Sequence, residues 1–181
     1  MKLILVRHGK TAANEELRYC GVTDLPLSEN GKAELAALKE NCPDAAGCRV
    51  LTSGMLRTDQ TLKILYGRKP DAVEPGFAEI NFGSFEMHTH EEFQFDPDYR
   101  AWRADTTGNL RMPGGESGNE FRARVLRALE TVKEDSLIVC HGGVIAVIMQ
   151  HLFPEENRQR YEWQPAWGHG YVVEDGKWRC F

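Results

Sequence analysis

The feature that most constrains the fold is a pattern that occurs twice, near the two ends of the chain. ILVRHGKT (4–11) and LIVCHGGV (137–144) each run from a continuous apolar stretch into a histidine, a glycine and the start of a helical segment. A continuous apolar run is typical of a strand buried on both faces of a parallel sheet. The ligand crevice of such a sheet lies beyond the carboxyl ends of its strands. We therefore expect His8 and His141 to lie together at that edge.

Helical segments between the apolar runs predict an α/β fold. A third, weaker apolar run covers 49–53, and helices are predicted over 28–41, 54–67, 117–134 and 142–153. Residues 170–181 alternate around Asp175-Gly176 and predict a terminal hairpin, which would finish its own sheet or pair across a dimer. Strands alternating with helices favour a three-layer sandwich, with helices on both faces of a mostly parallel sheet. The length fits a single domain spanning 1–181.

Composition argues against several classes of partner. The 181 residues carry a net charge of -5 without a basic run, which disfavours nucleic acid or an anionic membrane. Five cysteines without a CxxC pair disfavour a disulfide framework or a zinc ribbon. The first apolar stretch (3–6) is too short for a signal peptide or a membrane span. We expect a reduced, cytoplasmic protein. The acidic balance does not exclude a small phosphorylated partner, since a local cluster of arginines can bind an anion within an acidic protein.

Three predicted strand ends carry side chains that suit a phosphoryl group. They are Arg7, His8 and Gly9; Ser53, followed by Arg57; and His141, Gly142 and Gly143. Arg57 falls in the first turn of a helix, where free backbone amides favour an anion. A histidine with one nitrogen held in a hydrogen bond can attack phosphorus through the other. Glu79 is a candidate proton donor to the leaving alkoxide, although spacing alone does not choose it over Glu74 or Glu86.

At these positions the chain resembles the histidine phosphatase superfamily, also called phosphoglycerate-mutase-like. LVRHGKTAAN, LTSGMLRTDQTL, EINFGSFE, MPGGES and IVCHGGVI follow the order seen in that family, from residue 1 to about residue 153. A lone RHG is a weak signal, but the ordered set is specific. The resemblance implies a phosphohistidine enzyme that needs neither metal nor cofactor. In it His8 is the nucleophile, Arg7, Arg57 and His141 hold the phosphoryl group, and Glu79 is the general acid and later the base.

The same resemblance suggests where the substrate lies. We assign Asn14, Cys20, Gly21 and Gly142 to substrate binding, with Asn14 as a phosphate contact. RYCGVTDLPLSENGKAEL (18–35) is similar to the small α-ribazole phosphatases. Phe85 and Met87 depart from the Gly-x-Trp-Glu-Gly ending that is commoner in the family. Departures near the expected substrate mouth leave the identity of the substrate open.

These observations predict a metal-independent phosphomonoesterase acting on a small phosphorylated metabolite, with α-ribazole phosphate as one candidate. A phosphoglycerate-mutase-type phosphomutase is the nearest alternative, because the same site could return the phosphoryl group to another hydroxyl. A catalytically silent phospholigand-binding protein is a second alternative. The residue types alone would also permit a metallohydrolase built on His8, Glu79 and His141. The oligomeric state stays open, with a homodimer as one possibility.

One further motif has two interpretations. His88 and His90 form an HxH pair followed by Glu91 and Glu92, which could hold a metal ion. A helix start with solvated polar residues accounts for the same residues more simply. Three tryptophans, Trp102, Trp163 and Trp167, are expected to be packing or lid residues.

Overall fold

The computed structural model describes residues 1–181, and its centre is one six-stranded sheet with the order β3-β2-β4-β1-β5-β6. The strands are β1 (Leu3–Arg7), β2 (Arg49–Thr52), β3 (Ala72–Val73), β4 (Ser136–Cys140), β5 (Gly170–Glu174) and β6 (Lys177–Cys180). The first four strands are parallel, and the last two are antiparallel to their neighbours. The predicted mostly parallel sheet is therefore confirmed. Strand β3 was not predicted, because two residues carry no readable alternation.

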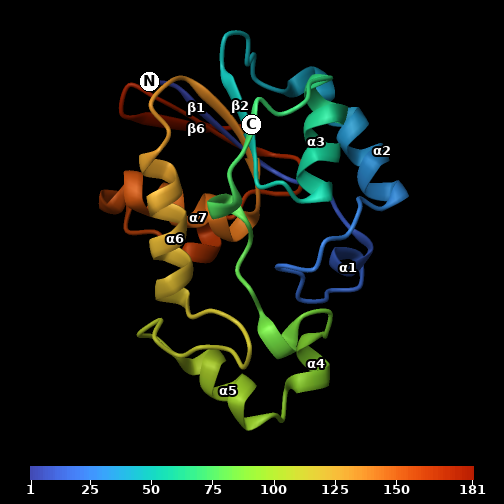
Figure 1. Cartoon of the computed structure of the whole chain (residues 1–181), viewed down its shortest axis with the longest axis vertical. Coiled ribbons are helices and arrows are strands. Elements are labelled where there is room, and N and C mark those ends of the chain that lie inside the picture. Colours follow the sequence, from blue (N-terminus) through green and yellow to red (C-terminus); the bar gives the residue numbers. More distant parts are fainter.

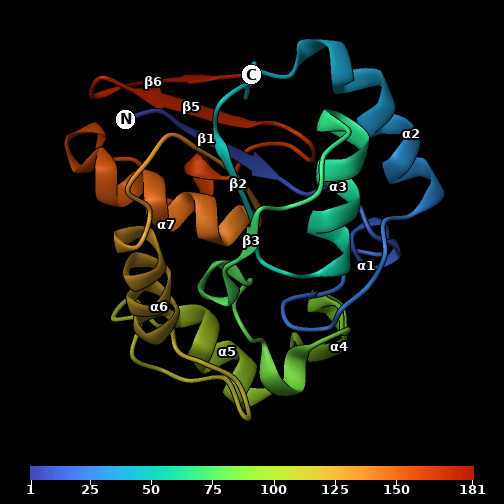
Figure 2. The same ribbon diagram turned by 45° about the horizontal axis from the view of Figure 1, so that its top comes forward.

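Helices cover both faces of this sheet (Figures 1 and 2). They are α1 (Ala12–Glu15), α2 (Glu29–Leu38), α3 (Leu56–Tyr66), α4 (His90–Phe93), α5 (Pro97–Ala104), α6 (Gly118–Glu130) and α7 (Gly142–Leu152). Helices α2 and α3 pack on one face, and α6 and α7 pack on the other. The three-layer sandwich expected from the alternating pattern is the observed architecture.

Alternation along the first strand explains why its apolar run is continuous. Ile4 and Val6 belong to the core shared with α2 and α3, whereas Leu3 and Leu5 belong to the core under α6 and α7. Successive side chains of a strand point to opposite faces, so a strand covered on both sides has no polar position. The two cores together hold 36 buried side chains, 24 in one and 12 in the other. This double cover makes β1 a rigid support for the residues that follow it.

Local signals in the sequence begin α2 and α6 and end α3 at the predicted residues, whereas α2 and α6 end at Leu38 and Glu130, before the predicted 41 and 134. The side chain of Ser28 accepts a hydrogen bond from the Gly31 N–H and begins α2. Ser117 and Glu120 form the predicted capping box of α6. Gly67 closes α3 in the left-handed conformation, with φ of 64°. The polar ends of these helices are therefore satisfied by their own sequences.

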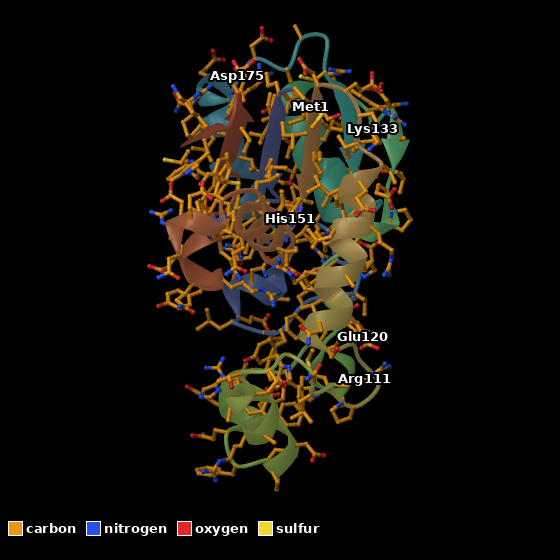
Figure 3. All side chains as sticks on the ribbon, turned by 90° about the vertical axis from the view of Figure 1, so that its left-hand side faces the viewer. Met1, Arg111, Glu120, Lys133, His151 and Asp175 are labelled. Carbon is orange, nitrogen blue, oxygen red and sulfur yellow. The ribbon has the colours of Figure 1, made fainter.

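The terminal hairpin completes the sheet of its own chain. Strand β5 pairs antiparallel with β1, with Leu3 opposite Val173, and its turn at Asp175-Gly176 has both residues at positive φ. Figure 3 shows Asp175 at the same end of the molecule as Met1 and Lys133, which precede β1 and β4. The carboxyl ends of the parallel strands thus lie at the opposite edge.

A long excursion of the chain (residues 74–117) leaves the sheet beyond these carboxyl ends. It carries α4 and α5, which lie at the bottom of Figure 1, away from the strands. Arg111 near its end forms an ion pair with Glu120 of α6 (Figure 3). None of the helices combines the length and the apolar character that crossing a membrane requires.

Candidate active site

Two neighbouring strands bring His8 and His141 together. Strand β1 lies beside β4 with Arg7 opposite Cys140, and the His8 N–H donates to the Cys140 carbonyl at 3.0 Å. His141 follows β4 and stands just before α7. The two imidazole rings are 5.0 Å apart, with 65° between their planes. The expected meeting of the two histidines at one edge is confirmed.

The structure determines which nitrogen of His8 is free to react. Nδ1 lies 2.7 Å from the Gly9 carbonyl oxygen, which can only accept, so Nδ1 carries the hydrogen. Nε2 then holds the lone pair. Burial lowers the pKa of His8 well below 6.5, and the charge of Arg57 lowers it further. The imidazole is thus neutral at physiological pH and presents a nucleophilic Nε2.

Two arginines lie beside the histidines, each held by backbone carbonyls. Arg7 stacks on the indole of Trp167, 3.4 Å from its ring centroid, and its Nη1 donates to the Pro165 carbonyl at 2.8 Å. Burial lowers the pKa of Arg7 to about 10, which leaves it charged at neutral pH. Arg57 is completely buried, and its terminal nitrogens donate to the carbonyls of Thr23 (2.9 Å) and Gly21 (2.6 Å). Both guanidiniums are fixed before any ligand binds.

Three buried nitrogen atoms around His8 have no hydrogen-bond partner in the protein. They are Nε of Arg7, Nε of Arg57 and Nδ1 of His141. A buried polar group without a partner typically costs roughly 1–3 kcal/mol, so such groups are rare and demand an explanation. Their residues end or follow three neighbouring strands, β1, β2 and β4, and all three lie near His8. Oxygen atoms of a tetrahedral anion would satisfy all of them.

A short hydrogen-bond chain orients His141. Its Nε2 lies 2.9 Å from Ser53 Oγ, which in turn lies 3.2 Å from Thr58 Oγ1. Nδ1 is therefore the ring nitrogen that remains for a ligand. Burial lowers the pKa of His141 well below 6.5, and the nearby His8 and Arg57 lower it further. Ser53, at the end of β2, thus holds the second imidazole in position.

Of the three candidate glutamates, only Glu79 lines the pocket in front of His8. Its Oε2 accepts from the Gly143 N–H at 2.9 Å, and its Oε1 accepts from the Ile80 N–H at 3.0 Å. Glu74, which directly follows β3, instead accepts a hydrogen bond from the Gly76 N–H. Position therefore favours Glu79 as the candidate proton donor, a role that stays a prediction.

Glu86 has a different task, which is to shape the loop that holds Arg57. Its carboxylate accepts from the backbone N–H groups of Gly21, Val22 and Thr23 and from the Thr23 hydroxyl. This arrangement turns the carbonyls of Gly21 and Thr23 toward the Arg57 guanidinium. A Cβ on residue 21 would lie 1.8 Å from the Ile80 carbonyl oxygen, so only glycine fits there. Gly21 therefore lies behind the pocket wall.

The glycine pair that follows His141 also makes room for functional side chains. A Cβ on Gly142 would lie 3.0 Å from Nε and Cζ of Arg7. A Cβ on Gly143 would lie 2.3 Å from Glu79 Oε1 and 3.1 Å from an Arg160 nitrogen. Gly142 is not among the pocket-lining residues, and its assigned part in substrate binding stays a prediction.

Arg7, His8, Glu79 and Gly143 line one open pocket of about 470 Å³, whereas Arg57 and His141 are fully buried and are not part of its lining. Its lining comprises Arg7, His8, Asn14, Leu17, Arg18, Tyr19, Cys20, Glu79, Ile80, Phe82, His90, Trp102, Gly143, Arg160, Gln164 and Trp167. The predicted Asn14 and Cys20 are included. Asn14 Oδ1 accepts from the Thr11 N–H and hydroxyl, so its Nδ2 is the donor left for the pocket.

Sequence reasoning missed Arg160 and Gln164 as pocket residues and treated Trp167 only as a packing or lid residue. All three lie beyond the last segment that resembles the family. Arg160 is in a short 3-10 turn (Arg160–Trp163), and the other two follow it. A charged residue among aromatics after the buried α7 was the only available signal.

The HxH motif is divided between two contacts. His88 Nδ1 lies 2.5 Å from Glu92 Oε2, and His90 Nδ1 lies 2.6 Å from the Tyr99 hydroxyl. Thr89 caps α4, so a polar helix start accounts for the motif. No group of three or more His, Cys, Asp or Glu side chains is placed to hold a metal ion.

A mostly parallel sheet of this topology, with histidines at two adjacent strand ends and arginines beside them, defines the phosphoglycerate-mutase-like class of proteins. The chain belongs to the histidine phosphatase superfamily (branch 1), whose family model matches residues 3–180. The resemblance drawn from the motifs is therefore confirmed. Among the relatives that match the chain are proteins named as phosphatases and proteins named as mutases.

Three relatives illustrate both names. The adenosylcobalamin/alpha-ribazole phosphatase of Salmonella typhimurium is 33% identical over 161 residues, which cover 84% of this chain and 79% of that protein. A 2,3-bisphosphoglycerate-dependent phosphoglycerate mutase of Gloeobacter violaceus is 32% identical, covering 85% of this chain and 78% of its own. The crystal structure of a phosphoglycerate mutase from Thermus thermophilus is 33% identical and superimposes with a TM-score of 0.78, covering 97% and 94% of the two chains.

Acidification is expected to destabilise the folded protein through its two buried histidines. Their pKa values are lowered in the folded state, mainly by burial, whereas an unfolded histidine titrates near about 6.5. Below that pH the unfolded chain binds more protons than the folded one. The free energy of unfolding therefore decreases by up to about 1.4 kcal/mol per histidine for each unit by which the pH is lowered. Above about pH 7 both states are neutral and the effect vanishes.

Denaturant unfolding at pH 5, 6, 7 and 8 measures this dependence. Below about pH 6.5, the free energy of unfolding of His141→Gln should change less steeply with pH than that of the wild type, because one buried histidine has been removed. Equal slopes in the two proteins would contradict the assignment of a neutral, buried His141.

Proposed function

We propose that this protein is a metal-independent phosphomonoesterase that forms a phosphohistidine at His8 and acts on a small phosphorylated metabolite. The observation that carries the proposal is the set of three unpartnered, buried nitrogens around a histidine whose Nε2 is free. Phosphoryl transfer needs chiefly positioning and charge stabilisation, and both are present before the substrate arrives.

In the first step, His8 Nε2 attacks phosphorus while the bond from phosphorus to the ester oxygen breaks. Arg7, Arg57 and His141 donate hydrogen bonds to the phosphoryl oxygens as their charge redistributes. Glu79 gives a proton to the leaving oxygen, so an alcohol departs rather than an alkoxide. The enzyme is left with a phosphoryl group on Nε2 and an ionised Glu79.

In the second step, water takes the place of the departed alcohol. Glu79 accepts a proton from the water as its oxygen attacks phosphorus, and the bond between phosphorus and Nε2 breaks. Inorganic phosphate leaves, and both His8 and Glu79 return to their starting states. The Gly143 and Ile80 N–H groups hold the Glu79 carboxylate in one place through both steps.

Two substrate classes follow from the named relatives. An α-ribazole phosphate is favoured by the phosphatase relative. A phosphomutase acting on a phosphorylated three-carbon acid is the alternative, because relatives of similar identity bear that name. A phosphatase releases inorganic phosphate, whereas a mutase moves the phosphoryl group to a second hydroxyl and releases none.

A turnover assay in excess chelator tests the proposal. The protein is incubated with an aryl phosphate, with α-ribazole phosphate and with a phosphoglycerate, and both inorganic phosphate and isomerised product are measured. We expect phosphate release without added metal, and an acid-labile, base-stable phosphoryl adduct when the reaction is quenched early. Activity that requires added metal would overturn the mechanism, and isomerised phosphoglycerate without free phosphate would favour the mutase.

A further inference from the structure

The pocket in front of His8 has two chemically different ends. Arg7, Glu79 and Arg160 gather at the strand end, where charge is abundant. The far end is formed by residues 17–19 and by the excursion, and its lining is largely apolar. Its one cation, Arg18, is engaged by Glu16 at 2.6 Å and by Glu92 at 3.2 Å. A ligand would therefore meet free positive charge at one end only.

Three aromatic side chains, which we call the aromatic wall, form that far end. Tyr19 and Phe82 have ring centroids 5.0 Å apart, and Trp102 lies 5.9 Å from Tyr19 and 6.2 Å from Phe82, nearly edge-on to both. All three are only partly buried. Aromatic faces and edges left accessible in this way favour a further planar ring.

Leu17 provides an independent observation at the same end. It lines the pocket, the residue is 83% exposed, and its backbone has φ of 57°, a left-handed conformation that costs a non-glycine residue energy. Because Leu17 is exposed, its apolar side chain does not stabilise the core, and the core does not explain its strained backbone. Strained backbone of this kind clusters at ligand-binding positions.

A polar edge borders the aromatic wall. His90 lines the pocket, and its Nδ1 is held at 2.6 Å by the Tyr99 hydroxyl, which lies 2.6 Å from the Tyr19 hydroxyl. Tyr99 itself is buried. This chain ties His90 of α4 to the wall and leaves its Nε2 for a ligand.

We propose that the aromatic wall, together with Leu17, is a subsite for an uncharged planar ring carried by the alcohol part of the phosphomonoester. The inference rests on the proposed function, because the phosphoryl site fixes one end of the ligand. It commits to an aromatic or heteroaromatic ring, with His90 as a hydrogen-bond partner at its edge. The HxH motif then has a part in recognition.

Binding of unreactive phosphonates tests the subsite without requiring turnover. Calorimetry compares 2-phenylethylphosphonate, 2-cyclohexylethylphosphonate and ethylphosphonate, which share the anionic end. We expect the phenyl compound to bind about tenfold more tightly than the ethyl compound, from the partial burial of one ring. The cyclohexyl compound should bind less tightly than the phenyl compound, because the wall accepts a flat ring.

Three variants test which residues produce the preference for the phenyl over the ethyl phosphonate. Leu17→Gly removes an exposed side chain and relieves the left-handed strain, so its thermal midpoint should not fall while the preference for phenyl over ethyl drops severalfold. Trp102→Leu should lower the preference as well. Phe95→Ala is the matched control, because Phe95 is an 82% exposed aromatic of the same excursion that does not line the pocket.

The outcomes separate the subsite from the proposed function. Equal affinity for phenyl and ethyl compounds, equal affinity for phenyl and cyclohexyl compounds, a preference untouched by Leu17→Gly and Trp102→Leu, or binding of none of the three phosphonates would each overturn the subsite. A retained preference in a protein that never hydrolyses phosphate esters would overturn the phosphatase proposal alone.

Discussion

Replacement of His8 by alanine is expected to reduce phosphatase turnover by roughly 10⁴-fold or more, as loss of a covalent nucleophile does in other enzymes. The variant keeps Arg7, Arg57 and His141, but no group remains that can form the phosphoryl-enzyme. Water would have to attack directly, without the neutral Nε2 that the Gly9 carbonyl prepares. Steady-state release of inorganic phosphate from an aryl phosphate measures the effect.

The exposed His151 at the end of α7 provides the control for this variant (Figure 3). His151→Ala should retain the turnover of the wild type. Binding of inorganic phosphate to His8→Ala, followed by calorimetry, should persist because the three donors remain. Turnover within tenfold of the wild type in His8→Ala would contradict the assignment of the nucleophile.

Replacement of Gly143 by alanine is expected to reduce turnover by about 10²-fold or more. The new methyl group would lie 2.3 Å from Glu79 Oε1, so the carboxylate must leave its position beside the Gly143 N–H. Loss of a positioned general acid typically costs about 10²–10⁴-fold. We expect kcat to decrease and KM to change little, because Arg7, Arg57 and His141, which are proposed to bind the phosphoryl group, are not displaced.

Two further variants make this prediction specific. Gly118→Ala is the matched control, since Gly118 also stands in the first turn of a helix but a Cβ there would meet only ordinary contacts at 3.5 Å or more. It should keep full turnover. In a Glu79→Gln background, Gly143→Ala should add little further loss, because both changes remove one function. Additive losses would mean that Gly143→Ala acts elsewhere than on Glu79.

Much of the fold could be predicted because the sheet is covered on both sides. The continuous apolar runs of β1 and β4, the Ser28 cap and the Asp175-Gly176 turn all specify local structure that the packing then preserves. Strand β3 could not be predicted, since its two residues pair only because β2 lies beside them. Its conformation comes from its neighbour and leaves no trace in its own sequence.

The site was predictable to the extent that it rests on strand ends. His8 and His141 are adjacent because their strands are, but the choice of Glu79 over Glu86 depends on contacts with Gly143 and Gly21, more than 60 residues away in the chain. Gly21 and Gly142 were assigned to the substrate, which stays a prediction; neither lines the pocket, and they lie next to Arg57 and Arg7. A glycine that makes room for a side chain looks the same in a sequence as one that touches a ligand.

The excursion that carries α4 and α5 has an evolutionary consequence. His8 and His141 follow strands whose cores tolerate little change, whereas Phe82 and Trp102 of the aromatic wall belong to a segment that leaves the sheet and returns. Substitutions in that segment can therefore change substrate specificity during evolution while the residues at the strand ends stay the same. Lineages about one-third identical to this chain that carry phosphatase and mutase names are what such divergence produces.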